Sequence, residues 1–294
     1  FEKKPFDFSK PNEYFYSFNN KIIKLYSDSK KVNFLAKRAI KIKNIIPSNF
    51  KSTKNIFSYE KFQGEVVYKT LSPAITRNLL FFLEKNLWDL KKRIPQKNFL
   101  EICKNFYKNK TLDRITLFRK KYDVKDEKYI INNITYEKLS YYLNKIDWDY
   151  ICDGVQSQFH GDLQFDNIIY NHSKKNFKLI DWRSDFGGDT SVGDIYYDFA
   201  KMYSGCIVQY DEIKKNNFIF NMSSNEINFD YYIKYSVNVA KKDLLKYFIT
   251  RKYDTKKINI ISSLIFLNMS PMHQEPFSHL CYFLGLTRLK ESLL

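Results

Sequence analysis

The stretch of sequence from residue 160 to 181, HGDLQFDNIIYNHSKKNFKLID, constrains the fold more than any other. Two short apolar runs, residues 167–170 and 177–180, flank the polar turn NHSKKN, which favours an antiparallel hairpin. Such a hairpin brings the start of its first strand beside the end of its second. We therefore expect Asn167 and Asp181 at the same end of the hairpin, with Asp162 on the loop just before it.

Two carboxylates and an amide oxygen that converge in this way form a site of hard oxygen donors. Magnesium takes one or two carboxylates together with substrate phosphates, and phosphoryl transfer uses this arrangement. Taken singly, each residue would more often cap a turn or end a strand. Three of them at this spacing, with His160 beside them, favour a catalytic or metal-binding role over a structural one.

The sequence HGDLQFDN at 160–167, followed by IDWR at 180–183, resembles the catalytic and metal loops of the aminoglycoside phosphotransferase/choline kinase family. The sequence GDIYYDFAKMY at 193–203 also resembles a helix start of that family. The resemblance implies a protein-kinase-like fold and a magnesium-dependent transfer of phosphate from ATP or GTP to a small hydroxyl compound. It implies that Asp162 is the catalytic base, that Asn167 and Asp181 hold Mg²⁺, and that His160 braces the loop. We read Asp194 as a helix cap and Asp198 as a cap or a buried support.

The pattern of elements predicts an α+β fold of two lobes. Residues 1–64 form a small antiparallel-sheet lobe with one main helix, which binds nucleotide and ends in a hinge near 60–64. Residues 65–294 form a larger, mainly helical lobe with the catalytic loop, the metal site and the acceptor pocket. The expected strands are 13–18, 21–26, 54–62 and 64–70, and the expected helices are 27–46, 74–93, 96–122, 135–146, 195–206 and most of the C-terminal third, including a core helix at 258–269.

On the nucleotide side, Lys24 occupies the position of the family's phosphate-contacting strand lysine, and the strand register decides between it and Lys21. Backbone groups of Glu60, Lys61 and Phe62 are expected to bind the purine. Two features depart from the family. The expected phosphate-covering loop at 6–15 has no glycine, and no glutamate lies between Lys30 and Ile46. Either Asn33 or Glu60 supports Lys24, or nucleotide binding is altered.

The acceptor pocket belongs to the helical lobe. An ammonium acceptor would need an aromatic face and a carboxylate, whereas a sugar would need paired polar groups. The residues in the sequence fit both kinds of acceptor. The candidate acceptor contacts are Asp166, Gln164, Arg183, Asp185, His273 and Glu275.

Composition limits the partners. The net charge is +17, but the lysines are scattered, and the excess of Lys, Asn, Ile, Phe and Tyr is what an A/T-rich genome produces. This argues against nucleic acid as a partner and leaves contact with an anionic membrane surface open. No run approaches the roughly 20 apolar residues of a membrane span. The four cysteines form no CxxC pair, so we expect a reduced, cytoplasmic protein. The sequence starts at Phe1 without a methionine, and we expect a fragment or one module of a longer polypeptide.

The leading hypothesis is a kinase for an amino alcohol such as choline or ethanolamine, for a sugar or for an aminoglycoside, with a place in surface-polysaccharide or headgroup metabolism. Two alternatives stay open. One is a kinase for a lipopolysaccharide-type glycan at the membrane surface. The other is a catalytically inert, kinase-like nucleotide-binding module, which the missing glycines and helix glutamate suggest.

Overall fold

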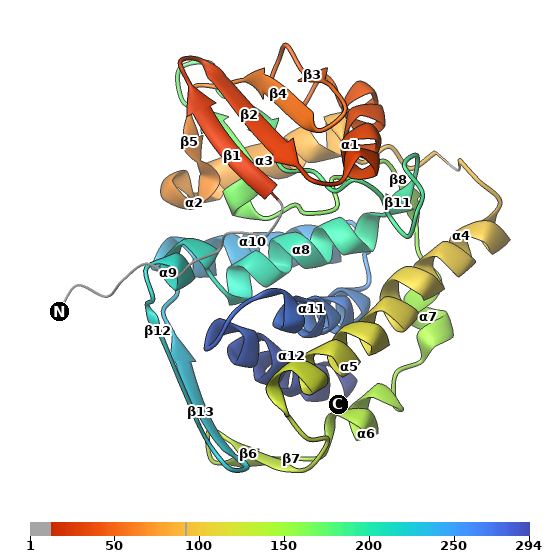
Figure 1. Ribbon diagram of the computed structural model, residues 1–294, viewed down its shortest axis with the longest axis vertical. Coiled ribbons are helices and arrows are strands. Elements are labelled where there is room, and N and C mark those ends of the chain that lie inside the picture. Colours follow the sequence, from red (N-terminus) through yellow and green to blue (C-terminus); the bar gives the residue numbers. More distant parts are fainter. Residues whose placement is uncertain (1–12, 92) are drawn as a thin grey trace.

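A small lobe built around a sheet lies above a larger, mainly helical lobe (Figure 1). The computed structural model describes residues 13–91 and 93–294. The predicted α+β architecture of two unequal lobes is confirmed. Most of the expected phosphate-covering loop, residues 6–12, lies outside the described residues.

The small lobe is a four-stranded sheet in the order β1-β2-β4-β3 with one long helix. The hairpin turn falls at Asn19, whose positive φ of 51° suits an asparagine turn, as expected from the sequence. Asp28 caps the helix by accepting a hydrogen bond from the Lys30 N–H at 2.8 Å. The elements are β1 (Glu13–Phe18), β2 (Lys21–Tyr26), α1 (Ser29–Lys41), β3 (Lys51–Ser52) and β4 (Ile56–Glu60).

The strand predicted at 64–70 is wrong. Only Glu65–Val66 is extended, as β5, and it is followed by the short helix α2 (Val67–Thr70). Strand β5 pairs with β9 of the large lobe rather than with the small-lobe sheet. The preference of Val and Tyr for strands is overridden by tertiary packing, because Tyr68 is buried and its hydroxyl donates to the Gly205 carbonyl at 2.7 Å.

The predicted hairpin at 167–180 is confirmed. Strands β9 (Ile168–Asn171) and β10 (Asn176–Leu179) pair antiparallel with Ile168 opposite Leu179. The hairpin also touches the small lobe, because the Leu179 N–H donates to the Ile45 carbonyl at 2.7 Å. Its polar end therefore faces the boundary between the lobes.

The large lobe is organised around α8 (Ile195–Ile207), whose 13 residues are all buried. In Figure 1 this helix crosses the middle of the molecule, with α11 and α12 below it. The predicted core helix at 258–269 is confirmed within α11. The other elements are α3 (Pro73–Asn86), α4 (Gln96–Lys104), a π-helical turn (Asn105–Asn109), α5 (Lys110–Tyr122), β6 (Tyr129–Ile131), β7 (Ile134–Tyr136), α6 (Leu139–Leu143), α7 (Trp148–Cys152), β8 (Gln156–Ser157), a 3-10 turn (Phe165–Asn167), β11 (Gly193–Asp194), α9 (Tyr210–Lys214), β12 (Phe218–Ser223), β13 (Glu226–Tyr231), α10 (Tyr235–Thr250), α11 (Thr255–Met269), a 3-10 turn (Ser270–Met272) and α12 (Phe277–Leu293).

Several helix limits differ from the prediction. Helix α1 ends at Lys41 and α3 at Asn86, so both are shorter than expected. The helix predicted at 135–146 is wrong over its first part, where β7 forms, and only α6 is helical. The β12–β13 hairpin is a further element that sequence reasoning missed, although alternating residues on both sides of the turn at Ser224 are a local signal for it. The parallel pairing of β13 with β6, about a hundred residues earlier in the chain, is long-range and leaves little local signal.

Helix α1 fixes the small lobe to the catalytic loop. The buried guanidinium of Arg38 donates to the Phe159 carbonyl and lies 3.6 Å from the centroid of the Phe159 ring. Burial lowers the pKa of Arg38 to about 9, which nearby carboxylates only partly offset. The Trp182 indole N–H donates to the Leu35 carbonyl at 3.2 Å. The two lobes are therefore joined by contacts immediately beside the predicted site.

The four cysteines are free and buried, as expected of reduced thiols. In the part of the chain that the structure describes, no helix has the length and apolar character needed to cross a membrane.

Candidate active site

The loop before the hairpin is held in place by a buried carboxylate. The backbone N–H groups of His160 and Gly161 donate to Asp198 of α8 at 2.8 and 2.7 Å, and the Trp88 indole N–H donates at 3.3 Å. Burial raises the pKa of Asp198 to about 6, although these hydrogen bonds oppose the shift. The structure thus gives Asp198 the supporting position that the sequence suggested, and Asp194 caps α8 as expected.

Gly161 is needed for the shape of this loop. Its φ is +83°, and a Cβ atom there would lie 2.6 Å from the Cβ of Arg183. A residue with a side chain would therefore be strained in backbone conformation and would clash with the segment that follows Asp181.

His160 connects the loop to the end of the hairpin. Its ring is fully buried, Nε2 lies 3.0 Å from the Ile180 carbonyl oxygen, and the Asp162 N–H donates to Nδ1 at 3.2 Å. A carbonyl can only accept, so Nε2 carries the proton and Nδ1 is free to accept, which is the neutral ring. Burial lowers the pKa of His160 to about 4, in agreement with this neutral form. The ring thus forms hydrogen bonds within the loop that His160 was expected to brace, and one to the end of the hairpin.

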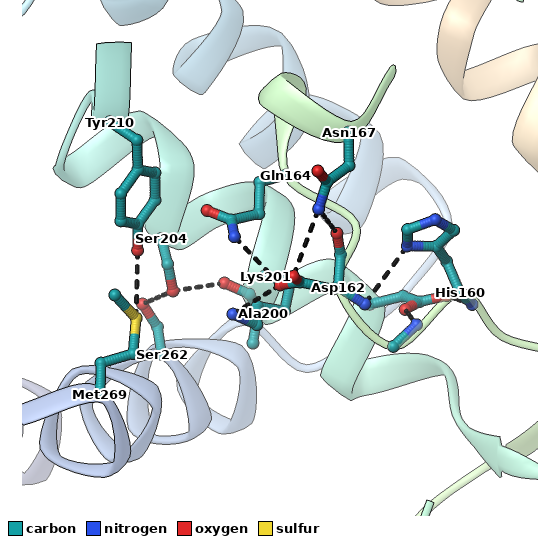
Figure 2. Close-up of polar contacts among 12 residues, drawn as sticks. His160, Asp162, Gln164, Asn167, Ala200, Lys201, Ser204, Tyr210, Ser262 and Met269 are labelled. Carbon is teal, nitrogen blue, oxygen red and sulfur yellow. Dashed lines mark hydrogen bonds and ion pairs between the residues drawn. The ribbon is translucent and has the colours of Figure 1, made fainter. Parts of the chain in front are cut away.

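The Asp162 carboxylate is surrounded by three donors, two from its own loop and one from α8 (Figure 2). One oxygen accepts from the Lys201 ammonium at 2.8 Å and from the Gln164 amide at 3.0 Å. The other accepts from the Asn167 amide at 3.2 Å. Donors that favour the charged form of a carboxylate also fix its orientation.

Lys201 is a site residue that sequence reasoning missed. It lies on α8 and is almost completely buried. Burial is the largest single influence on its pKa and lowers it, but the charges of Asp162 and Tyr197 and the hydrogen bond to Asp162 together raise the pKa above its ordinary value. The available signal was a lysine in the apolar run DFAKMY, because an unpaired lysine is hardly ever found inside a buried helix.

Asn167 and Asp181 lie at the same end of the hairpin, as predicted. The Ile180 N–H donates to the Asn167 carbonyl at 2.9 Å, which places Asp181 next to it. The Asn167 side-chain nitrogen donates to Asp162, so its amide oxygen points the other way (Figure 2). Both residues line a cavity of about 500 Å³, the Lys24 cavity, which is bordered by Lys24, Lys31, Asp162, Asn167, Asp181 and Lys214 among others.

This donor set suits magnesium rather than a softer metal. Two carboxylates and an amide oxygen line one cavity, and Mg²⁺ binds proteins through one or two carboxylates plus phosphate oxygens. Among the described residues, no group of three or more His, Cys, Asp or Glu side chains could hold a metal ion without such help. Asn167 and Asp181 therefore fit a metal that arrives with a phosphate ligand.

The strand register selects Lys24 over Lys21. Lys24 points into the cavity, where its ammonium forms an ion pair with the Asp181 carboxylate and its side chain is 12% exposed. Lys21 is exposed and lies opposite Glu60 in the register of β2 and β4. The lysine and the proposed metal ligand are thus already in contact across the two lobes.

The carboxylate that contacts Lys24 is not one of the residues suggested by the sequence. Asp181 contacts Lys24 directly, whereas Asn33 is exposed and the Glu60 carboxylate accepts hydrogen bonds from Ser48 and Asn49. A sheet-to-helix ion pair does exist, but with reversed charges, between Glu13 of β1 and Lys31 of α1.

The expected hinge residues lie apart from the carboxylates. The N–H groups of Glu60 and Lys61 donate to the carbonyls of Ser48 and Asn20 at 3.0 and 2.9 Å. Of the described residues that line the Lys24 cavity, Val66 comes from this part of the chain, and Glu60, Lys61 and Phe62 are not among them.

A second cavity of about 370 Å³ adjoins the first, and we call it the Lys110 cavity. The two share Asp162, Asp181 and Lys201 along their border. The second is otherwise bounded by α5, α8, α11 and the segment after α11, through Lys110, Arg114, Arg183, Tyr197, Asn268 and Met272 among others. Sequence reasoning missed Lys110 and Arg114, which belong to a helix far from the motif.

The six candidate acceptor residues separate into three groups. Arg183 lines the Lys110 cavity, and His273 lies on the border and lines both cavities. Asp166 and Gln164 line the Lys24 cavity, where Asp166 pairs with Lys214 at 2.9 Å.

Asp185 and Glu275 line neither cavity. Asp185 accepts hydrogen bonds from the Ser184 hydroxyl and the Gly188 N–H, both in its own loop. Glu275 is largely exposed and lies 3.8 Å from His279.

No protein-family model matches this chain, and no curated protein sequence matches it. Among solved structures, the chain is similar to the Plasmodium vivax ethanolamine kinase, with 17% identity over 96% of this chain and 82% of the other at a TM-score of 0.45. It is similar to a choline/ethanolamine kinase family protein from Mesorhizobium loti, with 9% identity over 99% and 88% of the two chains at a TM-score of 0.47. It is also similar to the GDP complex of aminoglycoside 2'-phosphotransferase-IIIa, with 13% identity over 98% and 94% at a TM-score of 0.45.

Proposed function

We propose that this chain is a magnesium-dependent phosphotransferase that moves the γ-phosphoryl group of ATP or GTP to the hydroxyl of a small molecule. One observation carries the proposal. Asp162, Asn167, Asp181 and Lys24, which the motif marks as a phosphoryl-transfer set, line a single cavity between the two lobes. Phosphoryl transfer depends mainly on positioning and charge stabilisation, and this cavity offers both.

Asp162 is the proposed base. The acceptor oxygen forms a bond to the γ-phosphorus as the bond from that phosphorus to the β-phosphate oxygen breaks. The proton passes from the acceptor hydroxyl to the Asp162 carboxylate, and the electron pair leaves with the nucleoside diphosphate. Lys201, Gln164 and Asn167 hold the carboxylate in position, and His160 holds the loop without changing charge near neutral pH.

Asn167 and Asp181 are the proposed holders of Mg²⁺, which when bound neutralises charge on the nucleotide phosphates. Lys24 is the proposed phosphate contact on the small-lobe side. Glu60, Lys61 and Phe62 remain the proposed hinge contacts to the purine, with residues 1–64 as the nucleotide-binding lobe and 65–294 as the acceptor lobe. The acceptor classes are an amino alcohol, a sugar or an aminoglycoside in surface-polysaccharide or headgroup metabolism, in a cytoplasmic protein.

The test combines binding and turnover. Nucleotide with Mg²⁺ at 100 times its dissociation constant should stabilise the protein by about 2.7 kcal/mol in a thermal shift. Nucleotide consumption is then screened across amino alcohols, sugars and aminoglycosides, with Asp162→Asn as the blank.

Loss of the proton acceptor should lower turnover by about 10² to 10⁴-fold while the nucleotide shift is kept. No shift with ATP or GTP at millimolar concentration contradicts the proposal and favours the inert module. An Asp162→Asn variant with native turnover contradicts the assignment of the base.

A further inference from the structure

The Lys110 cavity contains a cluster of positive charge that the proposed chemistry does not use. Lys110 and Arg114 lie one turn apart on α5, and Arg183 follows Asp181 by two residues. All three line the same cavity, which Lys201 and His273 also line. Helix α5, the segment at Arg183 and helix α8 therefore all bring cations to one space beside Asp162.

These cations lack carboxylate partners among the described residues. Lys110 lies 3.8 Å from the centroid of the Phe106 ring, and the Arg183 guanidinium lies 5.0 Å from the same centroid. Arg114 contacts the sulfur of Met272. None of the three forms an ion pair within the described part of the chain, and Arg183 Nε is buried there without a hydrogen-bond partner.

The carboxylates nearest to this cluster are already engaged. Asp162 pairs with Lys201 and Asp181 with Lys24 at the border of the cavity. Asp185 accepts hydrogen bonds within its own loop. Burial, followed by the charges of Arg183, Lys201 and Arg114, lowers the pKa of Lys110 well below its ordinary value, with Asp185 opposing. Like charges held this close in a partly buried space repel one another, and an anionic ligand would remove that repulsion.

We propose that the acceptor is an anion, a small hydroxyl compound that also bears a phosphate or a carboxylate group, and that Lys110, Arg114 and Arg183 bind this group. This inference rests on the proposed function and narrows its acceptor class. The hydroxyl lies at Asp162, on the border of the two cavities, and the anionic group lies deeper, against α5 and Arg183. The same charges repel choline, ethanolamine and aminoglycosides, so the cavity selects partly by repulsion.

Four sugars with one ring but different charge test the proposal: glucose, glucosamine, glucuronate and glucose 6-phosphate. Their binding to the full chain is measured by calorimetry at constant ionic strength, with Mg²⁺ and a saturating non-hydrolysable ATP analogue so that phosphate cannot occupy the Lys24 cavity. We expect at least one of the two anions to bind about tenfold or more tightly than glucose and glucosamine, as for a charge-assisted contact. The two anions separate phosphate from carboxylate recognition. Equal binding of all four sugars, or tighter binding of glucosamine, overturns the inference.

The variants Lys110→Gln, Arg114→Gln and Arg183→Gln locate the binding group. Each substitution should weaken the binding of the preferred anion by about tenfold and should have little effect on the binding of glucose. The matched control is Lys120→Gln, an exposed residue of the same helix that lines neither cavity, and it should change binding less than about twofold. Equal losses in the control and the three variants would mean a general charge effect and would overturn the site.

Folding of the variants provides an independent readout. Because burial, and then its cationic neighbours, disfavour the charged form of Lys110, ligand-free Lys110→Gln should melt at or above the wild-type temperature. The anion should raise the wild-type melting temperature and raise that of the variant less. A variant that melts well below wild type, together with equal anion shifts in both proteins, contradicts the inference.

Failure of this inference is distinguishable from failure of the proposed function. If the protein binds nucleotide and phosphorylates a neutral or cationic acceptor in an Asp162-dependent way, only the proposal of an anionic acceptor is contradicted. If no nucleotide causes a thermal shift, the proposal that the protein is a phosphotransferase is contradicted.

Discussion

The two cavities that meet at Asp162 differ in how their charges are balanced. In the Lys24 cavity, cations face carboxylates: Lys24 with Asp181, Lys31 with Glu13, and Lys214 with Asp166. In the Lys110 cavity, Lys110, Arg114 and Arg183 face aromatic rings and a methionine sulfur instead. One space is close to neutral, and the other holds an excess of positive charge.

This difference in charge balance bears on which kind of ligand each cavity would bind. A neutral set of ion pairs can exchange partners when a metal–nucleotide complex enters, because the carboxylates would bind the cation and the lysines would bind the phosphates. An unbalanced cluster gains from any anion that fits, because the ligand supplies the missing charge. This difference supports the proposal that metal and nucleotide bind in the Lys24 cavity and the acceptor in the Lys110 cavity.

The largest expected effect comes from Asp181, where the comparison could fail most directly. Asp181→Asn removes a proposed Mg²⁺ ligand and leaves Lys24 without the carboxylate it contacts. Turnover should fall by at least about a hundredfold, and the part of the nucleotide thermal shift that depends on Mg²⁺ should disappear. Asp185→Asn, four residues later and outside both cavities, is the matched control and should keep both properties. Equal effects in the two variants would disprove the metal assignment.

The second prediction concerns His160, whose neutral ring forms hydrogen bonds next to both Asp162 and Asp181. Its pKa in the fold lies near 4, below the ordinary 6.5, because burial disfavours the charged ring. The stabilisation it provides is therefore complete above pH 6.5 and is lost as the pH falls from 6.5 towards 4. Over that window the wild-type protein should lose about 3 kcal/mol from this residue.

The measurement is chemical unfolding of wild type and His160→Gln between pH 4 and 7. At pH 7 the variant should be about 2 kcal/mol less stable, because two buried hydrogen bonds are disturbed. This difference should shrink as the pH falls. The contribution of Asp198, whose raised pKa of about 6 acts in the opposite direction, is common to both proteins and cancels. A difference that stays constant with pH would show that the ring is not buried in its neutral form.

Lys201 sharpens the comparison at the border of the cavities. Lys201→Met removes the buried ammonium that contacts Asp162 and should lower turnover by about tenfold near neutral pH. Because a nearby cation favours an ionised carboxylate, the acidic limb of the pH–rate profile should move to higher pH. Lys201→Arg keeps the charge and should restore part of the profile. An unchanged profile in the methionine variant would leave Lys201 with a packing role only.

Glu275 should show the smallest effect. Its side chain is 61% exposed, lines neither cavity and lies 3.8 Å from His279, at the limit of an ion pair. Glu275→Gln should change turnover and acceptor affinity by less than about twofold, as for most exposed pairs. A loss of tenfold or more, measured with the preferred sugar, would place the acceptor outside the Lys110 cavity.

The helix limits show where local sequence loses its predictive value. Asp28 and Ser72 cap α1 and α3 through side-chain hydrogen bonds to backbone N–H groups, and both starts were predictable. The segment from 64 to 70 has a strand composition but turns helical, because Tyr68 is drawn into the large lobe. Contacts with distant residues decided that segment.

The sequence by itself determined the hairpin, the common end of Asn167 and Asp181, and the loop that carries Asp162. Turn residues and strand alternation are local, so the order of residues fixes which side chains lie at each end. The tertiary structure alone decided which charges surround them. Lys201 arrives on α8, and Lys110 and Arg114 arrive on α5, across distances in the chain that no spacing rule covers. Whether a buried charge is balanced depends on every segment packed around it, and only the assembled fold brings those segments together.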